Sequence, residues 1–205
     1  YPVSLNAAFE KQRDAYKQFK KRLEDKELDT EGLTELNCVW GPLRLTDFNT
    51  IESRASDSNK PENVMALSSL YKGVTEYILA ENPEVIIDEY DTHSPSNLFK
   101  VSSGKIVIPS YNRLKEFEKS GVEMGLENPE LTSYLANILE TGSRGLENPK
   151  YLTPFVQMIQ DRRSFADDIV NEAKRRGIEL DHKIDGDGAK QLRNYIADSY
   201  EASLN

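Results

Sequence analysis

The phrase Gly-Leu-Glu-Asn-Pro occurs twice in this chain, at residues 125–129 and 145–149, and a shorter copy, Glu-Asn-Pro, stands at residues 81–83. Each residue type suits a helix boundary. Glycine adopts the left-handed conformation that closes a helix, asparagine caps the next helix, and proline fits a first turn, where its missing N–H costs nothing. The phrase therefore predicts a backbone divided into short helices. Two copies do not make a solenoid, because helical repeat families need longer units and at least three of them.

Apolar residues recur at helical spacing along most of the chain. The predicted helices cover residues 4–26, 61–81, 111–124, 129–140, 154–176 and 188–203. Gly177 and Ile178 are placed to close the fifth helix, and Asp185 or Asp187 is placed to cap the sixth. The first helix carries its apolar residues on one side, between many charges, so residues 1–28 are predicted to be an amphipathic arm that packs on the body or on a partner.

The β signal is confined to residues 84–109, where two short apolar segments flank Ser102-Ser103-Gly104, a sequence that suits a hairpin turn. Residues 29–59 show no regular period and are predicted to form an ordered, irregular segment anchored by Trp40. No linker rich in proline, glycine and serine divides the chain. The predicted fold is therefore mainly α: a single domain, residues 1–205, with about six or seven helices and one small β-hairpin insertion at residues 84–109.

The net charge of −9 at pH 7 argues against a nucleic-acid partner, because phosphate backbones are bound by clustered Lys and Arg. The strongest basic clusters, residues 20–22 and 174–176, fall in the C-terminal halves of predicted helices, where cations oppose the helix dipole. Residues 161–168 contain Asp161-Arg162-Arg163 and Asp167-Asp168, and Asp and Arg at helical spacing are typical of surface ion pairs on a helix. No apolar run approaches the roughly 20 residues that span a bilayer, so no membrane insertion is expected.

Cys38 is the only cysteine, which excludes an intramolecular disulfide, and its neighbours Val39 and Trp40 favour a buried thiol over a nucleophile. This cysteine alone does not fix the compartment. Because the chain starts at Tyr1, it is expected to be a processed product, such as an exported or secreted protein without its signal peptide, and otherwise a cytoplasmic protein.

Both histidines lie among acidic residues. If residues 88–93 were extended, Glu89, Asp91 and His93 would share one face. Carboxylates and imidazoles ligate divalent metals, so the two acidic clusters predict a candidate metal site. Its residues would be Asp91, His93, Asp181, His182, Asp185 and Asp187.

Ordinary solvated turns and helix caps account for the same residues, and no fixed-spacing motif such as His-Glu-x-x-His occurs. Residues 181–192 do not form an EF-hand, because Lys183 and Leu192 stand where oxygen ligands are needed. A looser calcium-binding turn at residues 185–188 remains an alternative.

The sequence contains neither Gly-x-Gly-x-x-Gly nor Gly-x-Ser-x-Gly, and residues 102–105 lack the first glycine of a phosphate loop. The leading hypothesis is therefore a non-enzymatic, acidic interaction or structural protein that acts through helical surfaces on a protein partner or on a second copy of itself. One alternative is a metal-dependent, hydrolase-like enzyme that uses His93 and His182 with nearby carboxylates. Another is a helical module that binds a small molecule in an apolar pocket. No cofactor is expected apart from the divalent metal of the enzyme hypothesis.

Overall fold

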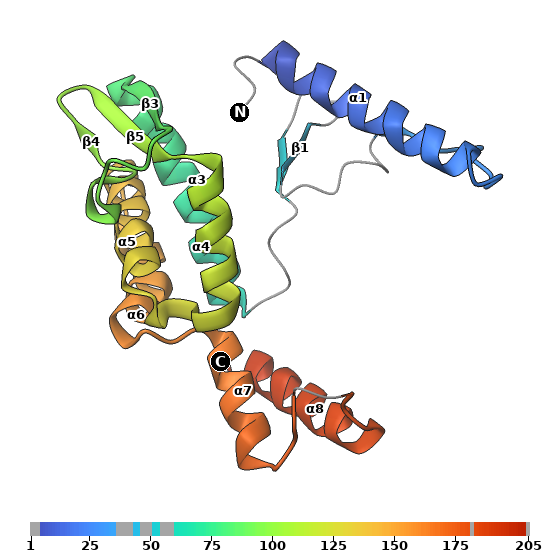
Figure 1. The fold of residues 1–205 in the computed structure, drawn as a ribbon. Helices are drawn as coiled ribbons and strands as arrows, with labels where there is room; N and C mark the ends of the chain where they lie inside the picture. The colour runs from blue at the N-terminus through green and yellow to red at the C-terminus, as the bar shows by residue number, and fades with distance from the viewer. Residues whose placement is uncertain (1–4, 36–42, 46–50, 54–59, 181–182, 204–205) are drawn as a thin grey trace. The chain divides into compact units, whose positions relative to one another are not determined.

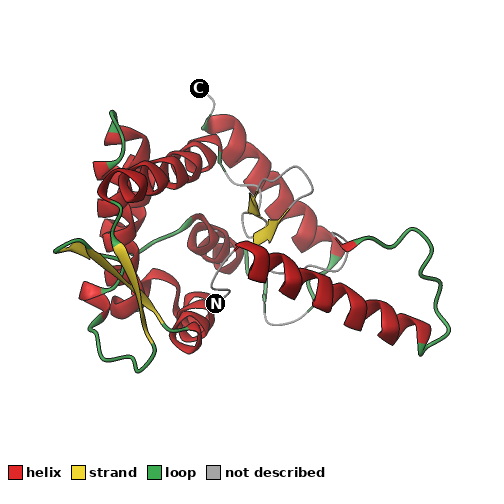
Figure 2. Cartoon of the chain, turned by 90° about the horizontal axis from the view of Figure 1, so that it is seen from above, coloured by secondary structure: helices red, strands yellow, loops and turns green. Residues whose placement is uncertain are grey.

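The chain has a mainly α fold with a small β-sheet, as the sequence predicts. The computed structural model describes residues 5–35, 43–45, 51–53, 60–180 and 183–203. Seven α-helices lie in these ranges (Figures 1 and 2). The chain divides into two compact units, residues 1–58 and 59–205, and its organisation as a single domain stays a prediction.

The first unit contains α1 (Leu5–Glu24), which lies within the predicted amphipathic arm. Lys21 and Arg22 in its last turn oppose the helix dipole. The Tyr16 hydroxyl donates a hydrogen bond to the carbonyl oxygen of Leu33 at 3.1 Å, which ties the helix to the segment that follows it. Whether this arm binds a partner stays a prediction.

Two short strands follow α1 in the first unit. β1 (Leu43–Leu45) and β2 (Ile51–Ser53) pair in antiparallel fashion, so the prediction that residues 29–59 are irregular is wrong for these segments. Each strand is only three residues long, too short for a period of two to be recognised in the sequence. Cys38 and Trp40 lie outside the described residues.

The second unit is built on the packing of α3 (Pro61–Glu81) against α5 (Pro129–Arg144). A Cβ placed on Gly73 would lie 2.1 Å from the carbonyl oxygen of Gly142, and one placed on Gly145 would lie 2.0 Å from the carbonyl oxygen of Gly73. Such distances are far below van der Waals contact, so the two backbones can approach this closely only where side chains are missing.

The repeated phrase marks helix boundaries, but its residues act differently in each copy. Gly125 follows α4 (Tyr111–Met124) with a φ of 56°, and the Asn128 side chain caps α5 by accepting hydrogen bonds from two backbone N–H groups. Gly145 has a φ of −90°, so the left-handed conformation predicted for it is wrong, and its contact with α3 is what requires glycine. In the third copy, Asn82 ends α3 in a left-handed conformation instead of starting a helix.

Residues 84–109 form a small mixed sheet with the strand order β3-β5-β4. β5 (Lys105–Pro109) pairs in parallel with β3 (Glu84–Asp88) and in antiparallel fashion with β4 (Val101–Ser102). The β4–β5 turn has φ values of 52° at Ser103 and 73° at Gly104, the geometry that matches the twist of hairpin strands. The predicted hairpin is confirmed, and β3 extends it.

Helix α5 holds the loop that precedes β4. The Asn137 side-chain amide donates hydrogen bonds to the carbonyl oxygens of Ser96 and Leu98, at 2.9 and 2.8 Å, and the Thr141 hydroxyl donates one to the carbonyl oxygen of Phe99 at 3.2 Å. Leu98 is completely buried at this junction. One edge of the sheet is therefore fixed to the helical core by side-chain hydrogen bonds as well as by apolar packing.

The remaining helices are α6 (Thr153–Asp161), α7 (Phe165–Arg175) and α8 (Gly186–Ala202), and short 3-10 helices lie at residues 95–97, 125–127 and 149–152. The prediction of one helix over residues 154–176 is wrong, because Arg162 adopts a left-handed conformation and separates α6 from α7. Asp185 caps α8, as predicted. Within the described ranges, no helix has both the length and the apolar character needed to cross a bilayer.

Candidate functional site

His93 lies in a tight turn after β3 that is organised by Asp88. The buried Asp88 carboxylate accepts hydrogen bonds from the backbone N–H groups of Thr92 and His93, at 2.9 and 2.8 Å, and from the Thr92 hydroxyl. Burial alone would raise the pKa of Asp88, but these hydrogen bonds hold that pKa well below its ordinary value. The turn is not extended, so the shared face predicted for Glu89, Asp91 and His93 is not formed.

The other residues of the predicted metal site serve local backbone structure. The Asp91 carboxylate accepts a hydrogen bond from the Ser110 hydroxyl at 2.9 Å, and the Asp185 carboxylate accepts one from the backbone N–H of Gly188 at 2.7 Å. Asp187 is exposed in the first turn of α8.

Asp181 and His182 lie outside the described residues. In the part of the chain that the structure describes, no group of three or more His, Cys, Asp or Glu side chains is arranged to hold a metal ion. The metal site, and the enzyme hypothesis that depends on it, therefore stay predictions.

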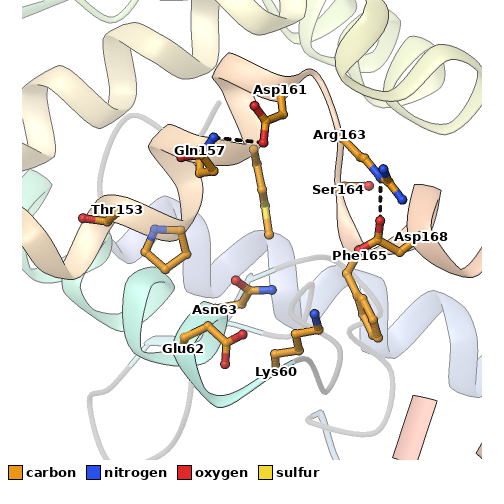
Figure 3. A pocket seen from close by; sticks show the side chains of 12 residues that line it. Lys60, Glu62, Asn63, Thr153, Gln157, Asp161, Arg163, Ser164, Phe165 and Asp168 are labelled. Atoms are coloured by element: carbon orange, nitrogen blue, oxygen red, sulfur yellow. Dashed lines mark hydrogen bonds and ion pairs between the residues drawn. The ribbon is translucent and has the colours of Figure 1, made fainter. Parts of the chain in front are cut away.

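A pocket of about 650 Å³ opens in the second unit, where the first turn of α3 faces α6 and the start of α7 (Figure 3). Its volume is in the range of small-molecule sites. The charged side chains on its wall are Lys60, Glu62, Asp161, Arg163 and Asp168. The uncharged residues on its wall are Asn63, Thr153, Pro154, Gln157, Met158, Ser164 and Phe165.

The α3 wall of the pocket begins at Pro61, whose fixed φ suits the first helical position. It places Glu62 and Asn63 on the first turn of the helix, and the Asn63 side chain is buried. Just before the helix, the Lys60 ammonium lies 4.7 Å from the centre of the Phe165 ring, within the range of a cation–π attraction. This contact joins the start of α3 to the start of α7.

The opposite wall is the turn between α6 and α7. Arg162 has a φ of 50° and ends α6, and the backbone N–H of Arg163 donates to the carbonyl oxygen of Met158 at 3.0 Å. Ser164 then caps α7 through a capping box, in which its backbone N–H donates to the Asp167 carboxylate at 2.7 Å. This hydrogen bond lowers the pKa of Asp167. The turn is thus held by its own hydrogen bonds and gives the pocket a preformed wall.

The acidic side chains of the pocket differ in what they contact. Asp161 accepts a hydrogen bond from the Gln157 side chain at 2.9 Å, and Asp168 forms an ion pair with Arg163, as Figure 3 shows. Among the described residues, the Glu62 Oε2 atom is buried and has no hydrogen-bond partner. A buried carboxylate oxygen without a donor is unfavourable, so this atom is a preferred position for a donor group supplied by a ligand.

An apolar cavity of about 300 Å³ lies next to this pocket, between α3, α5 and α6. Its lining is formed by Leu67, Leu70, Leu126, Leu135, Ile138, Leu139, Phe155, Met158, Ile159 and Ser164. Met158 and Ser164 also line the polar pocket, so the two spaces meet at these residues. An apolar lining of this kind favours apolar molecules over water. We call the pocket between α3, α6 and α7 the polar pocket, and the cavity between α3, α5 and α6 the apolar chamber.

None of the residues of the polar pocket or the apolar chamber was among the predicted metal ligands. The ion pair between Arg163 and Asp168 agrees with the surface ion pairs predicted for residues 161–168. The spacing of Ser164 and Asp167, which is that of a capping box, is the sequence signal that indicates a helix start at this point. No sequence signal shows that one Glu62 oxygen is buried, because that burial depends on how three helices meet.

The described residues that line the polar pocket include neither His nor Cys, so they offer no imidazole–nucleophile pair. No protein-family model, curated protein or solved structure matches this chain. The choice of function therefore depends on the geometry of the polar pocket and the apolar chamber.

Proposed function

We propose that this chain is a non-enzymatic binding module for an amphipathic small molecule that has an apolar tail and a hydrogen-bond-donating head. The observation that carries the proposal is the apolar chamber, which meets a polar pocket at Met158. A tail in the chamber would be removed from water, which contributes about 25 cal/mol for each Å² of apolar surface buried. The head would stay among the polar side chains of the mouth.

The charges of the polar pocket favour a cationic head, such as a primary ammonium group. The Glu62 Oε2 atom needs a donor, and an ammonium group offers three. The basic side chains have partners already, since Lys60 lies over Phe165 and Arg163 pairs with Asp168. An anionic head would instead enter a pocket that is lined by the carboxylates of Glu62, Asp161 and Asp168. These like charges would repel it.

A thermal-shift experiment with matched ligands tests this proposal. Octylamine, octanol and octanoate share one apolar chain and differ in the head group. We expect octylamine to raise the melting temperature most and octanoate least, because at equal concentration the ligand that binds the folded state most tightly stabilises it most. Glu62→Gln should remove most of the advantage of the amine over the alcohol. Glu76→Gln, at an exposed position of the same helix, is the matched control and should leave that advantage intact.

The apolar chamber is tested separately by filling it. Leu135→Trp adds a large side chain to the chamber wall and should abolish the shift with all three ligands, whereas Leu79→Trp, at a position that is 72% exposed, should not. The proposal fails if none of the ligands stabilises the wild-type protein. It also fails if the folded Leu135→Trp variant responds as the wild type does.

The predicted protein partner is our second candidate function, favoured by the exposed side of α3. Val64, Tyr71 and Leu79 are 45%, 48% and 72% exposed and follow each other at intervals of seven and eight residues, which places them on one side of the helix. Sedimentation velocity over a wide concentration range tests self-association through this side. A species whose mass rises with concentration, and falls back in Leu79→Lys, would support the candidate. A monomer at every concentration would refute self-association.

A further inference from the structure

The edge of the small sheet at β3 offers backbone hydrogen-bonding groups to a partner. In the strand order β3-β5-β4, β3 is an edge strand, and β5 is its only neighbour among the described residues. The backbone N–H of Glu84 donates to the carbonyl oxygen of Gly104 at 2.8 Å. Because alternate residues of a strand point their backbone groups to opposite sides, Glu84, Ile86 and Asp88 face β5. Val85 and Ile87 therefore face away from it.

The side chains of the outward residues are apolar and exposed. Val85 is 56% exposed and Ile87 is 37% exposed, and residues two apart in a strand lie on the same face of the sheet. Tyr90, just beyond the strand, is 86% exposed. Natural edge strands are usually protected by charged residues, especially lysine, by proline or by a bulge. β3 has no lysine, proline or bulge within its five residues, and its two charged residues, Glu84 and Asp88, stand at its ends. This edge is therefore suited to adding another strand.

The charges around β3 indicate which strand it would accept. Exposed acids lie on both sides of the apolar pair: Glu81 and Glu84 before it, and Glu89 and Asp91 after it. Of these, Glu84 is paired with Lys105 at 3.5 Å. A second copy of β3 is a poor occupant, because antiparallel pairing centred on Ile86 would set Glu84 opposite Asp88, and like charges directly opposite are destabilising.

We infer that the outer edge of β3, with which no other described strand pairs, is a docking site for an extended peptide with alternating apolar residues and basic residues at its ends. The main-chain hydrogen bonds would come from the N–H and carbonyl groups of Val85 and from the N–H of Ile87, because the Ile87 carbonyl oxygen already accepts a hydrogen bond from the Glu89 N–H at 3.0 Å. The side chains of Val85 and Ile87 would pack against the apolar residues of the peptide. The flanking acids would select the basic ends. This site is separate from the polar pocket, so it stands or falls independently of ligand binding there.

Fluorescence anisotropy with the full chain tests the inference directly. The probe is a labelled Lys-Val-Thr-Val-Thr-Val-Lys peptide, and the control is the same peptide with Glu in place of both Lys. The basic peptide is expected to bind at least roughly tenfold more tightly, and added salt should reduce the difference. Equal binding of the two peptides, or no binding of the basic peptide to the folded protein, overturns the inference.

Val85→Pro removes the outward N–H without removing a hydrogen bond to β5, and proline is tolerated on edge strands. It should weaken binding of the basic peptide by roughly tenfold, whereas the matched Val85→Thr variant, which keeps the N–H, should not. Unchanged binding by folded Val85→Pro overturns the inference. If Val85→Pro does not fold, the double variant Glu81→Lys, Glu89→Lys takes its place, because both side chains are exposed.

In the double variant the preference should move toward the acidic peptide, and an unchanged preference overturns the inference. A dimer of the chain that protects the amides of Val85 and Ile87 from hydrogen exchange would also overturn it, since the edge would then belong to a second copy.

Discussion

Gly73→Ala provides a sharp test of how the second unit is packed. In an ordinary helix, replacing an interior glycine with alanine stabilises by roughly 0.5–1 kcal/mol. At Gly73 the new Cβ would lie 2.1 Å from the carbonyl oxygen of Gly142 and 2.8 Å from the Leu146 side chain. The first of these neighbours is backbone and cannot turn aside. To reach an ordinary contact of 3.4 Å, α3 and α5 would have to separate by about 1.3 Å.

The expected magnitude follows from these two opposing effects. Overpacking of a core costs about 1–3 kcal/mol, and a clash with a fixed backbone atom belongs at the upper end of that range. After the gain in helix propensity, Gly73→Ala should lower the free energy of unfolding by about 2 kcal/mol. The control is Gly121→Ala in α4, where the new Cβ would meet only the Leu131 side chain at 3.4 Å. It should raise the free energy of unfolding by roughly 0.5–1 kcal/mol.

Urea denaturation followed by circular dichroism measures both variants against the wild type. The two substitutions should change the free energy of unfolding in opposite directions. For a unit of this size, each kcal/mol of unfolding free energy corresponds to roughly 2–4 °C in melting temperature. If Gly73→Ala stabilises the protein as much as Gly121→Ala does, the close approach of α3 and α5 is wrong.

Two further substitutions test local parts of the account. Ser164→Ala removes the cap of α7 and should lower the free energy of unfolding by about 1 kcal/mol in the same assay, and a loss no larger than that of an exposed Ser→Ala control would contradict the capping box. Asp88→Asn places an amide where the backbone N–H of His93 needs an acceptor, and should cost about 2 kcal/mol at neutral pH. Because the pKa of Asp88 is depressed in the folded protein, the stability that its carboxylate provides is present above the ordinary Asp pKa of about 4 and is lost as the pH falls below it. The difference between wild type and Asp88→Asn should therefore shrink below about pH 4, and a difference independent of pH would contradict the assignment.

Much of the fold follows from local sequence patterns. The period of apolar residues predicts α1, α3, α4, α5 and α8 closely, because each helix repeats apolar residues at helical spacing over several turns. The hairpin at Ser103 and Gly104 is also predictable, since few residue types adopt a positive φ. The break between α6 and α7 was missed because the apolar spacing continues across Arg162.

The candidate site was not predictable from local patterns. The spacing of Asp91 and His93 predicts a metal site only for an extended segment, but hydrogen bonds to the Asp88 carboxylate and from the Ser110 hydroxyl shape this segment into a turn. The polar pocket joins residues about 100 positions apart in the chain, such as Glu62 and Arg163, so its chemistry exists only after the helices pack. No local pattern in the sequence shows which acidic side chain becomes buried when the helices pack.

Methionine methyl signals offer the most direct test of the proposed binding function. The chain has three methionines. Met65 and Met124 are 56% and 52% exposed, and Met158 lines both the polar pocket and the apolar chamber. In an octylamine titration of protein labelled with ¹³C at the methionine methyl groups, the Met158 signal should shift and saturate while the other two signals stay in place. If all three signals shift together without saturation, or if Met158 does not respond, the chamber is not a ligand site.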